Sequence, residues 1–117
     1  MSDTPLRLVL FDFDGTLCDS AATIIRLMKQ ACAACDLPVP EDSFIRGNIG
    51  HGVSHAALAY ADGDPEKASQ LAETYRHIAR NEYLGGQPPL DPLFDGAKDI
   101  LRTLQSKDYL TGIITNK

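Results

Sequence analysis

Two carboxylates one residue apart, Asp12 and Asp14, belong to the pattern Asp-x-Asp-Gly-Thr at residues 12–16. They directly follow the apolar run Leu8–Phe11, so a buried strand covered on both faces would deliver them to its carboxyl end. A carboxylate can attack phosphorus, and oxygen ligands suit Mg²⁺, which offsets repulsion by the phosphate oxygens. Asp12 could therefore be nucleophile and Mg²⁺ ligand, while Asp14 could protonate a leaving alkoxide and deprotonate water.

The glycine turn after the carboxylates could hold a phosphate. Gly15 permits a sharp turn with close backbone approach, and free N–H groups at Gly15 and Thr16 would bind phosphate oxygens. The structural alternative is an ordinary turn, in which Asp-x-Asp-Gly is also common. A calcium-binding loop starts similarly, but this chain lacks the third ligand position and the later glutamate, which argues against a calcium-binding helical protein.

A second apolar run, 109–115, ends in Thr115, Asn116 and Lys117. In open α/β sheets, ligands bind outside the carboxyl ends of the strands. If the two strands lie parallel and adjacent, Asp12, Asp14 and Thr115 would meet at one edge. Thr115 could then donate a hydrogen bond to a phosphoryl oxygen during transfer.

Helices are expected between the two strands. The first would start at an N-cap from Asp19 or Ser20 and end at the prolines 38 and 40, with a stripe of Ile24, Met28, Ala31 and Cys35 buried. Further helices are expected at 42–45, at 53–61 and from Asp64-Pro65 to about residue 83. A flexible glycine loop spans 47–52, and the charged residues from Glu66 to Arg76 and Arg80 indicate a solvated helix face.

A glycine- and proline-rich linker is expected at 85–89, followed by a helix capped by Asp95. The buried stripe of that helix would comprise Ala97, Ile100, Leu101 and Leu104. The fold class is therefore α/β: a partial Rossmann-like parallel sheet, of which these are the first two strands, with an inserted α-helical cap. Residues 1–16 and 89–117 would form the core, and 17–88 the cap.

The composition of the chain limits the classes of ligand and partner that we expect it to bind. A net charge of −5 argues against nucleic acid or an anionic membrane, and no apolar run approaches the roughly 20 residues that span a bilayer. Residues 1–5 carry neither the basic region nor the long apolar region of a secretory signal, so we do not expect one, and we expect the three cysteines to be free thiols in a reducing cytoplasm. The Cys32-x-x-Cys35 spacing lies in a helical stretch without a second pair, which favours helix-face burial over a redox or zinc role. A small phosphorylated metabolite remains the expected ligand.

These motifs resemble those of the haloacid-dehalogenase-like hydrolases. Residues 8–17 with Asp19 and Ser20 resemble the first motif of that superfamily, and 113–117 resembles the second, in the form seen in phosphoglycolate phosphatases. The helical block between them is similar to the inserted cap of that subgroup. A carboxylate at Asp14 separates phosphoester hydrolases from true dehalogenases, which need no acid for a halide leaving group.

The resemblance implies roles for individual residues. Asp12 would form an aspartyl-phosphate, and Asp14 would be the general acid and base with its backbone carbonyl on Mg²⁺. Thr115 and Asn116 would orient the phosphoryl group. The cap loop makes Arg46, Asn48 and His51 candidates for substrate contact, and the alternative for Arg46 is a solvated helix end.

The resemblance also implies a lysine and an acidic pair after the second motif. The chain stops at Lys117, which belongs to that motif, so we expect an N-terminal fragment with little turnover on its own, and the alternative is a natural short protein. A phosphoryl-transferring mutase and a pyrophosphatase remain alternatives within the family. A non-enzymatic helical module that binds a partner, or self-associates through an exposed strand edge, is the alternative from another class.

Overall fold

The two apolar runs form a parallel pair of strands, as predicted. In the computed structural model, which describes residues 5–115, β1 (Leu8–Phe11) pairs with β2 (Leu110–Ile113). Leu8 lies opposite Leu110, and Phe11 lies opposite Ile113. Because the strands are parallel, the residues that follow both of them emerge at the same edge of the sheet.

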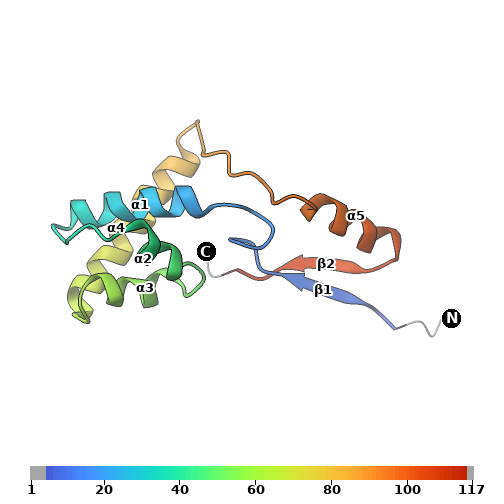
Figure 1. Cartoon of the computed structure of the whole chain (residues 1–117), viewed down its shortest axis with the longest axis horizontal. Coiled ribbons are helices and arrows are strands. Elements are labelled where there is room, and N and C mark those ends of the chain that lie inside the picture. The colour runs from blue at the N-terminus through green and yellow to red at the C-terminus, as the bar shows by residue number, and fades with distance from the viewer. Residues whose placement is uncertain (1–4, 116–117) are drawn as a thin grey trace.

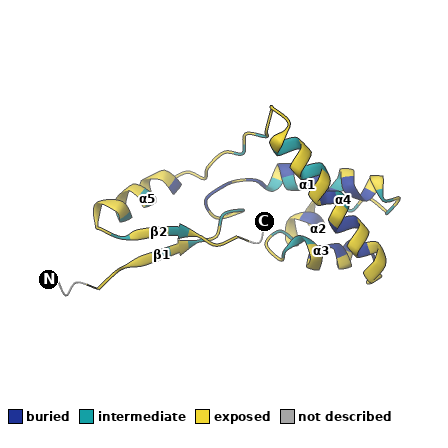
Figure 2. Ribbon diagram, turned by 180° about the vertical axis from the view of Figure 1, so that it is seen from behind, coloured by how far each residue is buried: buried dark blue, intermediate teal, exposed yellow. Residues whose placement is uncertain are grey.

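The strands are not buried on both faces, so that prediction is wrong. Leu8, Leu10, Leu110 and Ile113 are all at least half exposed. One helix, α5 (Ala97–Ser106), packs against β2 in the described part of the chain, and one helix cannot cover two faces of a sheet (Figure 1). Burial colouring shows the buried residues gathered among the helices α1 to α4, whereas the two strands carry only exposed and intermediate residues (Figure 2).

The helix before β2 also differs from its predicted form. Gly96, with φ +85°, occupies the N-cap position of α5, and Asp95 does not cap the helix. Glycine has no Cβ, so it adopts this left-handed conformation without strain. Of the predicted stripe only Ala97 is buried, because the two-stranded sheet offers α5 little surface to pack against.

Four helices make up the other end of the molecule, which we call the helical part. They are α1 (Ala21–Ala34), α2 (Asp42–Gly47), α3 (Val53–Tyr60) and α4 (Pro65–Leu84), close to the predicted ranges. Asp64 accepts hydrogen bonds from the N–H groups of Glu66 and Lys67 at 3.0 and 3.2 Å, so the predicted start of α4 is confirmed. The molecule is elongated, with principal extents of 61 × 29 × 26 Å.

The hydrophobic core lies within the helical part. Its most deeply buried members come from all four helices and include Leu27, Cys32, Ile45, Ala57 and Leu71. The predicted stripe of α1 is partly wrong. Ile24 and Cys35 are only half-buried, whereas Ile25 and Leu27 are buried in a helix that packs against both α2 and α4.

The first helix ends before the two prolines that were expected to end it. Asp36 has φ +55°, and the N–H of Leu37 donates to the carbonyl of Cys32 at 2.9 Å, which closes the helix end. Cys18, Cys32 and Cys35 are free thiols, as predicted. Within residues 5–115, no helix is long and apolar enough to cross a membrane.

Two connecting segments run between the helical part and the sheet, and they pair with each other. The N–H of Asp19 donates to the carbonyl of Pro92 at 2.7 Å, and the N–H of Phe94 donates to the carbonyl of Leu17 at 3.0 Å. This pairing holds the segment that leads into α1 against the segment that leads into α5. The proposed domain boundaries after residues 16 and 88 stay predictions.

Candidate active site

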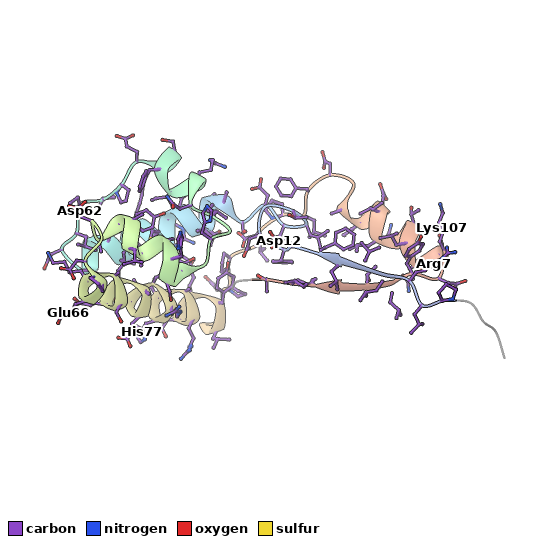
Figure 3. All side chains as sticks on the ribbon, turned by 90° about the horizontal axis from the view of Figure 1, so that it is seen from below. Arg7, Asp12, Asp62, Glu66, His77 and Lys107 are labelled. Carbon is purple, nitrogen blue, oxygen red and sulfur yellow. The ribbon has the colours of Figure 1, made fainter. Side chains whose placement is uncertain are left out.

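The ends of the two strands bring the predicted site residues together. The N–H of Ile114 donates to the carbonyl of Phe11 at 2.9 Å, which continues the parallel ladder one residue beyond β2. Asp12, Asp14 and Thr115 line one cavity of about 440 Å³. Asp12 lies at the junction of the sheet and the helical part (Figure 3). The structure therefore places at one edge the three residues that the strand pattern predicted would meet there.

The turn after Asp14 has the predicted shape but not the predicted free donors. Gly15 has φ +79°, a conformation that favours glycine. Its N–H donates to the carbonyl of Cys18 at 2.9 Å, and that of Thr16 donates to the carbonyl of Phe13 at 3.2 Å. The prediction that these two N–H groups are free for phosphate is wrong, because the tight turn uses them to close itself.

The carboxylate of Asp14 is held from the helical part. Ser20 donates its hydroxyl to Oδ1 of Asp14 at 2.5 Å, and Ser20 is buried. Ser20 occupies the predicted N-cap position of α1, but its side chain makes no capping hydrogen bond there. The serine therefore orients Asp14 and leaves the helix end uncapped.

The carboxylate of Asp12 is more open. Asp12 is exposed, and its Oδ1 accepts a hydrogen bond from the N–H of Phe13 at 2.8 Å. This contact turns one oxygen toward the following peptide. An accessible carboxylate at the mouth of a cavity is suited to attack on a bound electrophile.

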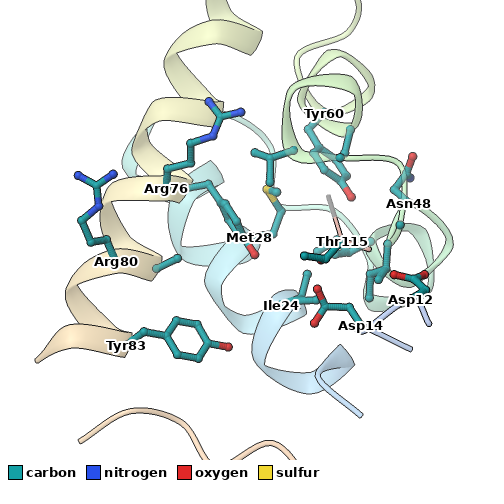
Figure 4. Close-up of a pocket in the computed structure, with 18 residues that line it drawn as sticks. Asp12, Asp14, Ile24, Met28, Asn48, Tyr60, Arg76, Arg80, Tyr83 and Thr115 are labelled. Atoms are coloured by element: carbon teal, nitrogen blue, oxygen red, sulfur yellow. The ribbon is translucent and has the colours of Figure 1, made fainter. Parts of the chain in front are cut away.

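The helices provide the opposite wall of the cavity (Figure 4). The side chains come from α1, from the α2–α3 loop and its flanking helices, and from one face of α4. Their polar members are Asn48, Tyr60, Tyr75, Arg76, Arg80 and Tyr83. Burial raises the pKa of Tyr60 to about 12, so its phenol keeps its proton at neutral pH and can donate a hydrogen bond.

Tyr83 joins the cavity wall to the segment between α4 and α5. Its hydroxyl donates to Oδ2 of Asp91 at 3.1 Å, and Thr23 of α1 donates to Oδ1 of the same carboxylate at 2.6 Å. Burial, followed by the nearby charge of Asp91, raises the pKa of Tyr83 well above its ordinary value. The tyrosine is therefore a neutral donor that connects α4 to α1 through Asp91.

Two further residues of the wall, Arg76 and Arg80, were missed by the sequence analysis. The prediction of a solvated face is correct in that both are exposed, but both also line the cavity. They lie four residues apart, on the same face of α4 as Tyr83. A helical face that carries cations and tyrosines together was the signal that could have identified them.

The other predicted contacts are placed differently. Arg46 and His51 are exposed and are not among the cavity residues, whereas Asn48 is. The side chain of Asn48 donates to the carbonyl of Phe44 at 2.8 Å. Asn116, which was expected to orient phosphate beside Thr115, lies outside the described residues.

The oxygen atoms at this edge are of the kind that bind a hard cation such as Mg²⁺. Asp12 offers carboxylate oxygens and Asp14 a backbone carbonyl, both oxygen ligands of the kind that Mg²⁺ prefers, and Mg²⁺ commonly binds through one or two carboxylates together with phosphate and water. Within residues 5–115, no three side chains of the His, Cys, Asp or Glu type gather into a metal site. The described residues therefore fit an ion shared with a phosphorylated ligand better than a closed protein cage.

The chain matches known proteins along nearly all its length. A family model described as haloacid dehalogenase-like hydrolase matches residues 9–117. The chain is 35% identical over 113 residues to an N-acetylmuramic acid 6-phosphate phosphatase of Pseudomonas putida, covering 96% of this chain and 49% of that protein. It is 27% identical over 116 residues to a phosphoglycolate phosphatase of Vibrio cholerae, covering 96% of this chain and 51% of that protein.

A solved structure shares the fold. It is described as a predicted phosphoglycolate phosphatase from Haemophilus somnus and aligns with a TM-score of 0.73 at 20% identity. The alignment covers 99% of this chain and 54% of that one. The chain spans about half the length of the curated relatives it matches.

Proposed function

The chain belongs to the haloacid dehalogenase-like hydrolase family, and from that membership we propose that it carries the nucleophile and general acid of a Mg²⁺-dependent phosphomonoester hydrolase. The observation that supports this most directly is that Asp12, Asp14 and Thr115 line one cavity. They come from the ends of two parallel strands, the position at which open α/β sheets bind ligands.

In the proposed reaction, an oxygen of Asp12 attacks the phosphorus and the bond from phosphorus to the leaving oxygen breaks. Asp14 gives its proton to that oxygen, so the alcohol leaves neutral and an aspartyl-phosphate remains. Asp14 then removes a proton from water, whose oxygen attacks the same phosphorus. Inorganic phosphate leaves, and the carboxylate of Asp12 is regenerated.

The neighbouring residues support these roles. The hydrogen bond from Ser20 holds one oxygen of Asp14, which restricts the direction in which its carboxyl group can transfer a proton. Thr115 would donate its hydroxyl to an oxygen of the transferring group. Mg²⁺, held by the carboxylate of Asp12 and the backbone carbonyl of Asp14, would supply positive charge that offsets the phosphate oxygens.

The substrate we propose is a small phosphorylated metabolite, and phosphoglycolate is the first to test. Two of the matched relatives are named for phosphomonoesters, phosphoglycolate and N-acetylmuramic acid 6-phosphate. Free cysteines, two of them buried, fit a reducing compartment, and we propose the cytoplasm.

The resemblance implies a lysine at the site of the complete enzyme. Among the described cavity residues the cations are Arg76 and Arg80, and no lysine is among them. We therefore expect this chain to bind phosphoesters with little turnover.

The test is whether Mg²⁺ strengthens phosphoester binding through Asp12. Isothermal titration of the 117-residue chain with phosphoglycolate should give tighter binding with Mg²⁺ than without it. In Asp12→Asn this dependence on Mg²⁺ should disappear. The control is Asp19→Asn, which removes an exposed carboxylate of the same segment that is not among the cavity residues.

Binding that is equal with and without Mg²⁺, or a Mg²⁺ dependence that survives in Asp12→Asn, would overturn the proposed site. Hydrolysis of p-nitrophenyl phosphate by the chain, abolished by Asp12→Asn, would support the chemistry and contradict the expected low turnover.

A further inference from the structure

The cavity has a second polar end, formed by α4. Arg76 and Arg80 lie on successive turns of that helix, and both line the cavity. Figure 4 shows both on α4, on the opposite side of the cavity from Asp12 and Asp14, with their guanidinium groups turned away from the two carboxylates. The proposed phosphoryl transfer uses neither guanidinium group. The cavity therefore carries a cationic end whose role is still unassigned.

The charge of this end is not neutralised within the described chain. Arg76 donates to the hydroxyl of Ser54 on α3 at 2.8 Å, a neutral partner that holds the side chain without cancelling its charge. Neither arginine takes part in the ion pairs found between residues 5 and 115, which are Arg26–Glu82 and Lys29–Asp42. An anion that entered the cavity would therefore find two cations available.

The wall between the two ends is largely apolar. Ile24, Met28, Val53 and Ala56 contribute to it, and such side chains cannot solvate a charge. An anionic group on a ligand would thus be drawn to the guanidinium groups, whose attraction is stronger beside apolar surface than in bulk water. The hydroxyl of Tyr60 is a neutral donor on the same wall, and it suits a ligand hydroxyl.

We propose that Arg76 and Arg80 bind a carboxylate on the part of the substrate that is not transferred, an inference that rests on the phosphatase function proposed above. A guanidinium group matches the planar geometry of a carboxylate and can donate two parallel hydrogen bonds to it. Both arginines are exposed, so their side chains can change rotamer to meet a ligand. The substrate class is then a phosphomonoester of a carboxylic acid.

Matched ligands test this inference. Phosphoglycolate is compared with 2-hydroxyethyl phosphate, and 6-phosphogluconate with glucitol 6-phosphate; within each pair only a carboxylate replaces a CH₂OH group. Binding to the 117-residue chain is measured by titration calorimetry with Mg²⁺. In at least one pair, the acid should bind about tenfold more tightly, as expected for a hydrogen-bonded charge pair near solvent.

The variant Arg76→Gln/Arg80→Gln should abolish this preference, so that the acid and the alcohol of each pair bind with equal affinity. Arg102→Gln removes an exposed cation from α5, away from the cavity, and should leave the preference intact. Ser54→Ala removes the hydroxyl partner of Arg76 while keeping both charges, and it should also retain the preference. Thermal melting of each variant checks that the helical part remains folded.

The outcomes separate the two proposals. If the phosphoesters bind with the Mg²⁺ and Asp12 dependence described above but acids and alcohols bind equally in both pairs, the carboxylate subsite is wrong and the phosphatase site stands. A preference for the acid that survives in the double variant overturns the subsite in the same way. If none of the four ligands binds in a Mg²⁺- and Asp12-dependent manner, both proposals fail.

Discussion

Ser20 and Asp14 join the two parts of the molecule through one side-chain hydrogen bond. The hydroxyl of Ser20, at the start of α1, lies 2.5 Å from Oδ1 of Asp14, in the turn that follows β1. Ser20 is only 1% exposed, so the contact lies away from bulk water. Because this buried hydroxyl donates its hydrogen bond to a carboxylate of the candidate site, the position of α1 affects the orientation of Asp14.

We expect Ser20→Ala to lower the free energy of unfolding by about 1–2 kcal/mol, because Asp14 loses a charged hydrogen bond in a partly buried setting. Ser20→Thr keeps a hydroxyl and should recover part of the loss. Urea denaturation followed by circular dichroism measures both. The matched control is Ser69→Ala on the exposed face of α4, which should be neutral or slightly stabilising. Equal effects of the two alanine variants would contradict this role of Ser20.

Asp91 should be a second structural link between the segments. Its carboxylate accepts hydrogen bonds from the hydroxyl of Thr23 at 2.6 Å and from that of Tyr83 at 3.1 Å. Asp91→Ala therefore leaves the buried hydroxyl of Thr23 without its acceptor. We expect a loss of about 2 kcal/mol in unfolding free energy. Asp95→Ala is the control, because that carboxylate is exposed and does not cap α5. A loss at Asp95 as large as at Asp91 would refute the assignment.

Much of the fold was predictable because its signals are local. The Asp64-Pro65 pair starts α4 through hydrogen bonds to the next residues, and Gly15 turns the chain through its own backbone conformation. Asp12 and Thr115 were predictable as neighbours for a related reason. Two short apolar runs that pair in parallel must deliver their next residues to one edge.

What failed depends on surfaces that one segment cannot specify. Ile100 carries the helical spacing of a buried residue, yet it is exposed because α5 has only a narrow sheet to cover. An apolar pattern shows which side chains of a helix would be buried if another element packed against that face. Arg76 and Arg80 were misjudged in the opposite way. Their relation to the cavity arises from α1, α3 and the strand ends, which are distant in sequence.

Tyr60 should make the fold sensitive to alkaline pH. Its pKa is raised by burial to about 12, above the ordinary value of about 10, so the folded state holds the phenol proton more tightly than the unfolded state. The resulting stability is complete below pH 10 and is lost as the pH rises through about 12. We expect this loss to be about 1–2 kcal/mol.

The measurement is urea denaturation at several pH values from 8 to about 12. Tyr60→Phe should show a shallower loss of stability with pH than the wild type. Part of the loss should remain, because the pKa of Tyr83 is also raised. Identical slopes for Tyr60→Phe and the wild type would contradict this account.

The stability of the helical part should depend on Leu71. This side chain is 0% exposed and lies in the first half of α4, the helix that packs against both α1 and α3. Leu71→Ala should cost about 2–5 kcal/mol, from lost apolar burial and the cavity that remains. Leu84→Ala is the same substitution on the same helix at a residue that is 78% exposed, and it should change stability by less than about 0.5 kcal/mol. Similar losses at both positions would show that the core lies elsewhere.

The exposed sheet should drive self-association of the purified chain. Ile113 is 55% exposed on one face of the short parallel sheet, and Leu10 and Leu110 are about as exposed on the other face, so the sheet presents apolar side chains to solvent. In a two-stranded sheet each strand also has an outer edge whose backbone groups can pair with another chain. Light scattering after size-exclusion chromatography should therefore report a mass that rises with protein concentration.

Ile113→Lys places a charge on this surface and should shift the chain toward monomer at the same concentration. The matched control is Leu58→Lys on α3, which adds the same charge at an exposed apolar residue of the helical part and should leave the association unchanged. Because the association and the cavity use different surfaces, Ile113→Lys should retain Mg²⁺-dependent phosphoester binding. A wild-type chain that stays monomeric and melts cooperatively at all concentrations would rule out association through the sheet.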